Sequence, residues 1–162
     1  MTAKIWESAI HLTLELEGGF VDDEHDNGGQ TKYGISKKAY PELDIPSLTM
    51  QQAKDIYYKD YWARCKCDYL PDALSVAVFD YAVNSGTMRA IKDLQLSLGV
   101  TSDGVIGNQT IGAANRIPLK SVIEDIHNRR LKFLMSLKSW KYYGNGWGSR
   151  VKRVQKFCEG LV

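Results

Sequence analysis

The chain has only three cysteines, and their spacing is not that of a zinc site. Cys65 and Cys67 are too close in sequence to bridge each other easily, and Cys158 has no obvious partner. At 162 residues, 44% of them hydrophobic, the chain can build one domain without disulfides or metals. We therefore expect reduced thiols, no metal and no cofactor, in a protein made in a reducing cytoplasm.

The sequence also lacks a long apolar run. No stretch approaches the roughly 20 residues that a membrane-spanning helix needs. Charged residues, among them Lys4 and Glu7, interrupt the N-terminal segment, which is therefore not typical of a secretory signal. We expect accumulation in the cytoplasm without stable membrane insertion, so that a target outside the membrane is reached only after a separate lesion.

The net charge is small, +2, but the charges are unevenly distributed. Six acidic residues lie between Glu15 and Asp26, and nine Lys or Arg lie between Ile126 and Cys158 with no acidic residue among them. A basic C-terminal face suits a polyanion such as the bacterial envelope or a nucleic acid, although single lysines here can equally be solvated. Nucleic acid is the weakest option, because no recognition motif accompanies the charge.

Apolar residues recur at helical spacing over much of the chain. A first helix over residues 2–16 is stopped by Gly18 and Gly19, and the glycine-rich segment 20–34 predicts a loop or small hairpin over a cleft. The pattern predicts a mainly α fold with a helical C-terminal lobe. Further helices are expected from 49, over 71–84 (apolar on nearly every side, hence central), 87–98, 110–116, 118–141 and, after a break at Gly144, Gly146 and Gly148, over 150–160.

Glu17 is the residue with the clearest chemical potential. It closes the first predicted helix, where the negative end of the helix dipole disfavours a charged carboxylate. The two following glycines leave space for a ligand to approach, and apolar neighbours such as Leu16 add desolvation. Cleavage of a glycosidic bond needs a carboxyl group that is protonated near neutral pH. We therefore predict that Glu17 is a general acid that keeps its proton and faces a sugar-sized groove.

A second catalytic group is expected in the loop that follows. Asp26 is the best candidate, because solvation there would keep it ionised while Glu17 is not. Thr31 can position a water molecule from across the hairpin. Asp22, Asp23 and Glu24 compete with Asp26 for this role, and spacing alone does not eliminate them.

Two blocks of the sequence resemble a known family. The segment E-G-G-F from Glu17, followed by D-N-G-G-Q-T-K-Y-G-I from Asp26, is similar to the N-terminal signature of glycoside hydrolase family 108, which contains phage endolysins and bacterial N-acetylmuramidases. The first glutamate of that signature is the family's catalytic residue, which implies Glu17. The segments 79–86, 94–95 and 103–107, with Ala90, resemble a peptidoglycan-binding type 3 region. A third, weaker match to the family is Gly146-Trp147 followed by Arg150-Val151.

The resemblance implies a lysozyme-like helical domain. Residues 1–85 would form the catalytic part and residues 86–162 a peptidoglycan-binding helical part, packed with the first into one compact unit. In the wider phage-lysozyme group five residues separate the catalytic aspartate from the threonine, whereas four separate Asp26 from Thr31. The roles of these two residues therefore stay open, and that of Glu17 is unaffected.

Several polar and aromatic residues are candidates for binding substrate. Asp80, Tyr81 and Asn84 share one helix face. Either they satisfy one another and the backbone, or they line a wet cleft and bind N-acetyl sugars. Tyr33 and Trp147 are candidates for stacking on sugar rings, as are Tyr142 and Tyr143.

The function expected first is hydrolysis of the β-1,4 bond between N-acetylmuramic acid and N-acetylglucosamine. Lytic transglycosylation is a second possibility, because one glutamate suffices for it. A non-catalytic wall-binding module is a third, in which Gln95, Asp103 and the basic face would bind peptidoglycan. We expect a monomer that reaches the wall through a holin-type lesion, as in a phage lysis cassette.

Overall fold

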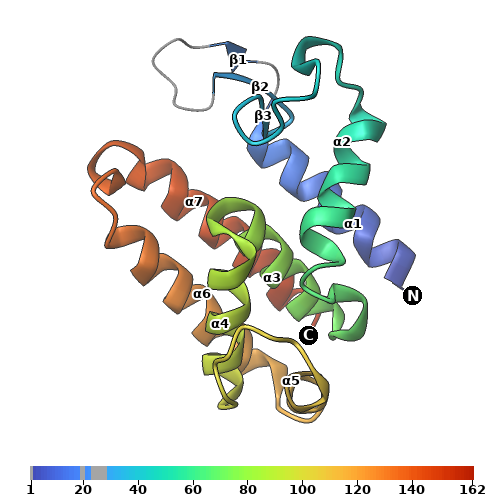
Figure 1. The fold of residues 1–162 in the computed structure, drawn as a ribbon. Coiled ribbons are helices and arrows are strands. Elements are labelled where there is room, and N and C mark those ends of the chain that lie inside the picture. Colours follow the sequence, from blue (N-terminus) through green and yellow to red (C-terminus); the bar gives the residue numbers. More distant parts are fainter. Residues whose placement is uncertain (1, 19–20, 23–28) are drawn as a thin grey trace.

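The computed structural model describes residues 2–18, 21–22 and 29–162. The described part is mainly helical, with one small sheet near the N-terminus, as expected (Figure 1). Its elements in chain order are α1 (Thr2–Glu17), β1 (Val21–Asp22), β2 (Gln30–Lys32), β3 (Ile35–Ser36), η1 (Ile45–Ser47), α2 (Met50–Tyr57), η2 (Tyr58–Trp62), η3 (Cys67–Tyr69), α3 (Asp72–Ser85), α4 (Thr87–Leu98), α5 (Asn108–Ala114), α6 (Leu119–Met135) and α7 (Trp140–Glu159).

Helix α3 forms the centre of the molecule. Every residue from Ala73 to Ala82 is buried, and α1, α4, α6 and α7 all pack against this helix. A helix that is apolar on all sides can be stable in water only when other elements surround it. The prediction of a central helix here is confirmed.

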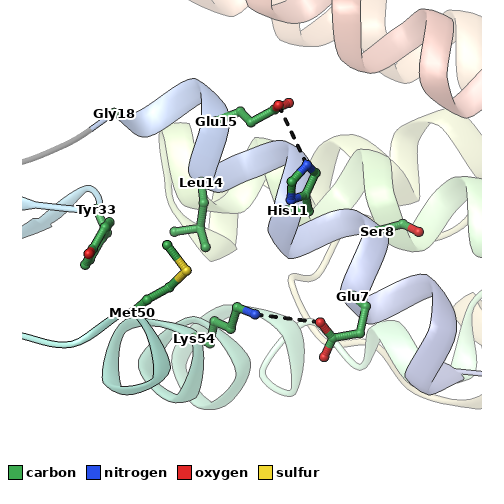
Figure 2. Close-up of a pocket in the computed structure, with 9 residues that line it drawn as sticks. All are labelled: Glu7, Ser8, His11, Leu14, Glu15, Gly18, Tyr33, Met50 and Lys54. Atoms are coloured by element: carbon green, nitrogen blue, oxygen red, sulfur yellow. Dashed lines mark ion pairs between the residues drawn. The ribbon is translucent and has the colours of Figure 1, made fainter.

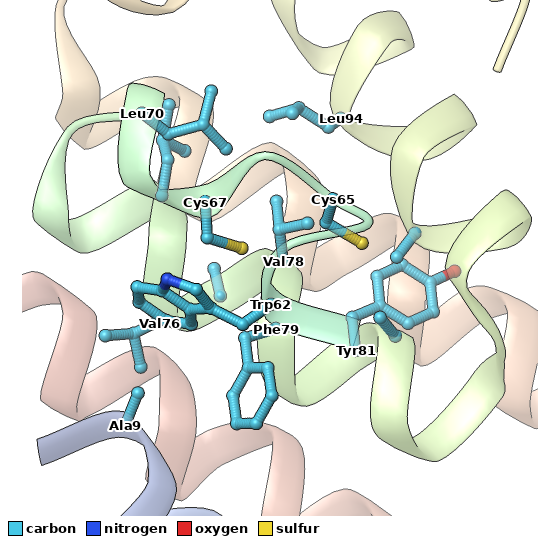
Figure 3. Close-up of a cluster of buried hydrophobic side chains, with 14 of the residues drawn as sticks. Ala9, Trp62, Cys65, Cys67, Leu70, Val76, Val78, Phe79, Tyr81 and Leu94 are labelled. Carbon is cyan, nitrogen blue, oxygen red and sulfur yellow. The ribbon is translucent and has the colours of Figure 1, made fainter. Parts of the chain in front are cut away.

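The core beside α3 is rich in aromatic rings and contains the cysteines. Trp62 and Phe79 pack edge to face, with ring centroids 5.5 Å apart, and Cys65 and Cys67 lie in the same cluster (Figure 3). All three cysteines are buried and unbonded. None of the described helices combines the length and the hydropathy that crossing a membrane would take.

The predicted hairpin is part of a three-stranded antiparallel sheet with the order β1-β2-β3. Thr31 in the middle strand lies opposite Val21 on one side and Ser36 on the other. The turn between β2 and β3 consists of Tyr33 and Gly34, with φ of 53° and 81°. Two positive φ values are what a tight two-residue hairpin turn requires, so this turn holds β3 directly beside β2.

The C-terminal helices differ from the expectation. Helix α6 ends at Met135, and α7 runs without a break from Trp140 to Glu159, through all three glycines that we expected to interrupt it. Gly144 is buried because the Trp140 ring lies on it, and an added Cβ would come within 2.7 Å of that ring. At Gly144, packing against Trp140 therefore offsets the low helix propensity of glycine, which is about 1 kcal/mol per residue worse than that of alanine.

Candidate active site

Glu17 lies on the wall of an open groove. It is the last residue of α1, and its side chain is 21% exposed. The groove has a volume of about 560 Å³ and lies between the end of α1, the end of α3 and the middle of α7. We call it the Glu17 groove; its lining residues are Leu16, Glu17, Val83, Asn84, Gly146, Trp147, Ser149, Arg150 and Arg153.

The surroundings of Glu17 differ from those that we predicted. Arg150 donates a hydrogen bond from Nη1 to Glu17 Oε1 at 2.8 Å, and the pair is largely shielded from solvent. The expectation of a lone Glu17 carboxyl group among glycines and apolar neighbours is therefore corrected. Local sequence could not reveal this partner, because Arg150 lies 133 positions away.

Arg150 is itself held by a buried carboxylate. Its Nε and Nη2 atoms each donate to one oxygen of Asp80, both at 3.1 Å. Arg130 Nη2 lies 2.9 Å from the same carboxylate, and Thr13 donates to it at 2.9 Å. Burial opposes the ionisation of Asp80, but the two arginines and the hydrogen bonds outweigh it and lower its pKa from 3.8 to about 2.

This network corrects two of the predicted sugar contacts. Asp80 is 0% exposed, and its oxygens are taken by Thr13 and the two arginines. Tyr81 is also buried, and its hydroxyl donates to Asp93. Of the alternatives left open for this helix face, mutual satisfaction describes Asp80 and Tyr81. Only Asn84 of the three lines the Glu17 groove, and its Oδ1 accepts from Arg130 at 3.3 Å.

The β2–β3 turn also lies against the side chain of Glu17. A Cβ added to Gly34 would lie 2.9 Å from both Cγ and Oε2 of Glu17 and would overlap the Tyr57 hydroxyl. That hydroxyl donates to the carbonyl of Tyr33 at 2.5 Å, which ties α2 to the turn. Gly34 is therefore required both by its φ and by the carboxyl group beside it. Our sequence interpretation missed the contacts of Gly34 and Tyr57; the only signal was the glycine in Y-G-I.

The other predicted residues lie elsewhere. Tyr33 lines a separate pocket of about 710 Å³ between α1 and α2, together with Leu14 and Met50 (Figure 2). It is not among the described residues that line the Glu17 groove. Thr31 is in the middle of the sheet, and Asp26 lies outside the described residues, as do Asp23 and Glu24.

The segment that resembles a peptidoglycan-binding region has an internal structural role. The Nε2 atom of Gln95 donates to Asp103, to the carbonyl of Val105 and to Thr110, and its Oε1 accepts from the Gly104 amide. Gln95 is buried, so these bonds hold the 103–107 loop on α4. The suggestion that Gln95 binds peptidoglycan is corrected, and the expectation of a structural turn at Asp103 and Gly104 agrees with these contacts.

Comparison with known proteins places this chain in a class of enzymes. The profile described as Glycosyl hydrolase 108 matches residues 10–86. The chain is also similar to a solved structure titled "Structure of Brucella abortus SagA", with 34% sequence identity and a TM-score of 0.88 over 96% of this chain and 94% of that one. No curated protein sequence matches the chain.

The match and the fold define a glycoside hydrolase with a lysozyme-like helical architecture. The chain belongs to glycosyl hydrolase family 108, as its N-terminal signature implied. It is accordingly an enzyme that degrades peptidoglycan. The matched residues end at Gly86, and neither comparison assigns peptidoglycan binding to residues 87–162.

Proposed function

We propose that this enzyme is a muramidase that hydrolyses the β-1,4 bond between N-acetylmuramic acid and N-acetylglucosamine, with Glu17 as the general acid. The observation that carries the proposal is the position of Glu17, whose carboxyl group lines a groove bordered by Asn84 and Trp147. The amide of Asn84 offers hydrogen-bonding groups suited to an acetamido sugar, and Trp147 offers an apolar ring face. The family supplies the reaction class.

Glu17 must carry a proton to act as an acid, and in the structure its carboxyl group is paired with Arg150. Proton uptake does not, however, leave Arg150 unpaired. Asp80 still accepts hydrogen bonds from two nitrogens of Arg150. The Arg150 guanidinium therefore keeps a buried, negatively charged partner when Glu17 is neutral. A sugar in the groove would exclude water from Glu17 and favour its neutral form. We therefore infer that Glu17 is protonated in the substrate complex and donates to the departing glycosidic oxygen.

The second step of the reaction has two versions. In hydrolysis, Asp26 and Thr31 would place the water or support the positive charge on the sugar. In lytic transglycosylation, the muramyl hydroxyl attacks within the same sugar, and Glu17 alone acts as acid and then base. Among the described residues lining the Glu17 groove, Glu17 is the only carboxylate. This observation favours keeping lytic transglycosylation as a second candidate, because that reaction needs one carboxyl group. Mass spectrometry of released muropeptides distinguishes a reducing end from an anhydro-sugar.

The acid role is tested by Glu17→Gln, in which an amide oxygen can still accept the hydrogen bond from Arg150. The matched control is Glu15→Gln, which removes a carboxylate two residues away that also pairs with α7, through Arg153. Clearance of permeabilised Gram-negative cells should fall about 100-fold or more in the first variant and stay at the wild-type rate in the second. A folded Glu17→Gln enzyme that clears cells at the wild-type rate would remove Glu17 from the mechanism.

We also propose how the enzyme reaches its substrate. It would accumulate in the host cytoplasm and reach the periplasmic wall after a holin-type membrane lesion, as in phage lysis. Fractionation of cells that express the chain without any holin tests this route. The enzyme should then be found in the cytoplasm, and its recovery from the periplasm of intact cells would contradict the route.

A further inference from the structure

Helix α7 carries one continuous apolar stripe whose two halves have different surroundings. In the C-terminal half, Val151, Val154 and Cys158 follow one another at intervals of three and four residues, and all are buried. The same spacing continued towards the N-terminus reaches Trp147 and Trp140, with Tyr143 on the adjoining edge. These rings are only partly buried or exposed. The apolar face of the helix therefore extends beyond the core, and the part outside the core consists of these aromatic rings.

The rings form one connected surface. Tyr143 and Trp147 have centroids 5.6 Å apart with an angle of 31° between their planes, and Trp140 lies 6.2 Å from Trp147. Tyr143 is 59% exposed. Trp147 also lines the Glu17 groove, so this surface is continuous with the candidate active site. We call Trp140, Tyr143 and Trp147 the aromatic platform.

A glycine without a side-chain neighbour lies beside the platform. Gly146 lines the Glu17 groove, and a Cβ added there would meet no atom within 4 Å. Packing therefore does not require glycine at this position, although glycine costs helix stability there relative to alanine. The exposed backbone at Gly146 keeps the groove open between Arg150 and the aromatic platform. A flat ligand can lie against this part of the helix.

We propose that the aromatic platform and Gly146 form a binding site for further sugar rings of the glycan strand, continuing the groove away from Glu17. This inference rests on the proposed function, because it assumes that the groove holds a glycan. Apolar faces of pyranose rings stack on aromatic side chains, and the distance from Trp147 to Trp140 along the helix is about 10 Å, room for about two rings. The site would make binding depend on the length of the strand.

The proposal is tested by measuring how tightly peptide-free glycan strands, two to eight sugars long, bind to the Glu17→Gln enzyme. Tryptophan fluorescence reports the binding. Tyr143→Ala should weaken binding of the long strands about tenfold and leave the shortest unchanged. The matched control is Tyr69→Ala, which removes a tyrosine of similar exposure, 63%, that lies in η3 and belongs neither to the aromatic platform nor to the residues lining the Glu17 groove. This control should bind strands of every length as the parent does.

A second variant separates binding from folding. Gly146→Leu places a side chain in the groove and replaces glycine in a helix, so the thermal midpoint should stay the same or rise while long strands bind more weakly. The proposal is overturned if both Tyr143→Ala and Gly146→Leu bind long strands as tightly as the parent. It is also overturned if they lose only binding to anionic phospholipid vesicles, because exposed tryptophan and tyrosine also suit a membrane surface. Absence of muropeptide release by the wild-type enzyme would instead count against the proposed function.

Discussion

Two ion pairs join the end of α1 to α7, and they have very different surroundings. In the outer pair, Glu15 and Arg153 are 46% and 52% exposed, and water and salt screen their charges. In the inner pair, Glu17 and Arg150 are 21% and 11% exposed, and Arg150 forms a second ion pair with the buried Asp80. Two glutamate–arginine pairs that lie close together thus differ in how strongly they should contribute to stability. Burial and the further partner Asp80 make the inner pair part of a buried network, whereas the outer pair, which His11 joins at 3.7 Å from Glu15, stays exposed to solvent.

The largest effect should come from removing the centre of the inner network. Asp80→Ala leaves Arg130, which is 1% exposed, without its carboxylate, and uncompensated buried charges typically cost about 3–5 kcal/mol. We expect a loss of this order in the free energy of unfolding, measured by urea denaturation at pH 7. Thr13→Val removes only one hydrogen bond to the same carboxylate and should cost about 1 kcal/mol.

The Asp80 prediction has a pH signature. Because the pKa of Asp80 is lowered from 3.8 to about 2, its carboxylate contributes its full stabilisation above about pH 4 and loses it as the pH falls towards 2. The difference in stability between the wild type and Asp80→Ala should therefore be constant above pH 5 and shrink below it. A difference that stays constant down to pH 2 would show that the charge is not what stabilises this site.

The contact between the turn and Glu17 should give the next largest effect. Gly34→Ala forces a positive φ on alanine and pushes a methyl group into Glu17 and Tyr57, so we expect a loss of about 2–4 kcal/mol together with most of the activity. Gly99→Ala is the matched control, since its φ is 72° and its Cβ would meet no atom within 4 Å. It should show only the backbone strain and keep its activity per folded molecule. Equal effects of the two variants on activity would contradict a specific role for Gly34.

A smaller effect is expected from His127, which is buried beside the inner network. Burial lowers its pKa from 6.5 to about 4, although the Ile123 carbonyl, which accepts from Nδ1 at 2.7 Å, opposes this. The neutral ring is favoured in the folded state, so stability is fully present above pH 6.5 and falls as the pH drops towards 4. The loss should be about 2 kcal/mol by pH 5. In His127→Gln, which does not titrate, this part of the pH dependence of the urea midpoint should disappear.

The smallest effect should come from the outer pair. Glu15→Gln removes the charge that faces Arg153, and exposed pairs of this kind contribute about 0–1 kcal/mol. The thermal midpoint should therefore hardly change, and any change should vanish in 1 M salt. A loss as large as that of Asp80→Ala would mean that the two pairs act as one network, which would remove the distinction drawn above.

Sequence patterns predicted the elements well where the pattern is local. The periodicity over 2–16, the all-apolar segment 71–84 and the glycine-rich hairpin each match an observed element, because hydrophobic spacing directly reflects which face of an element is buried. The three glycines of α7 misled the prediction, because their cost to the helix is local while the compensating contact at Gly144 comes from the packed Trp140 ring. Asp80 and Tyr81 misled it in a similar way, since a polar helix face can bind a ligand or a partner inside the protein.

The sequence by itself determined that Glu17 ends a helix beside glycines, within a motif of glycosyl hydrolase family 108. Helix endings and glycine turns depend on neighbouring residues, so they can be inferred from a short window. Only the tertiary structure decided that Arg150 holds Glu17, that Asp80 holds Arg150, and that Gly34 lies against the same carboxyl group. These contacts join residues far apart in the chain, and the packing of α1, α3 and α7 brings them within hydrogen-bonding distance.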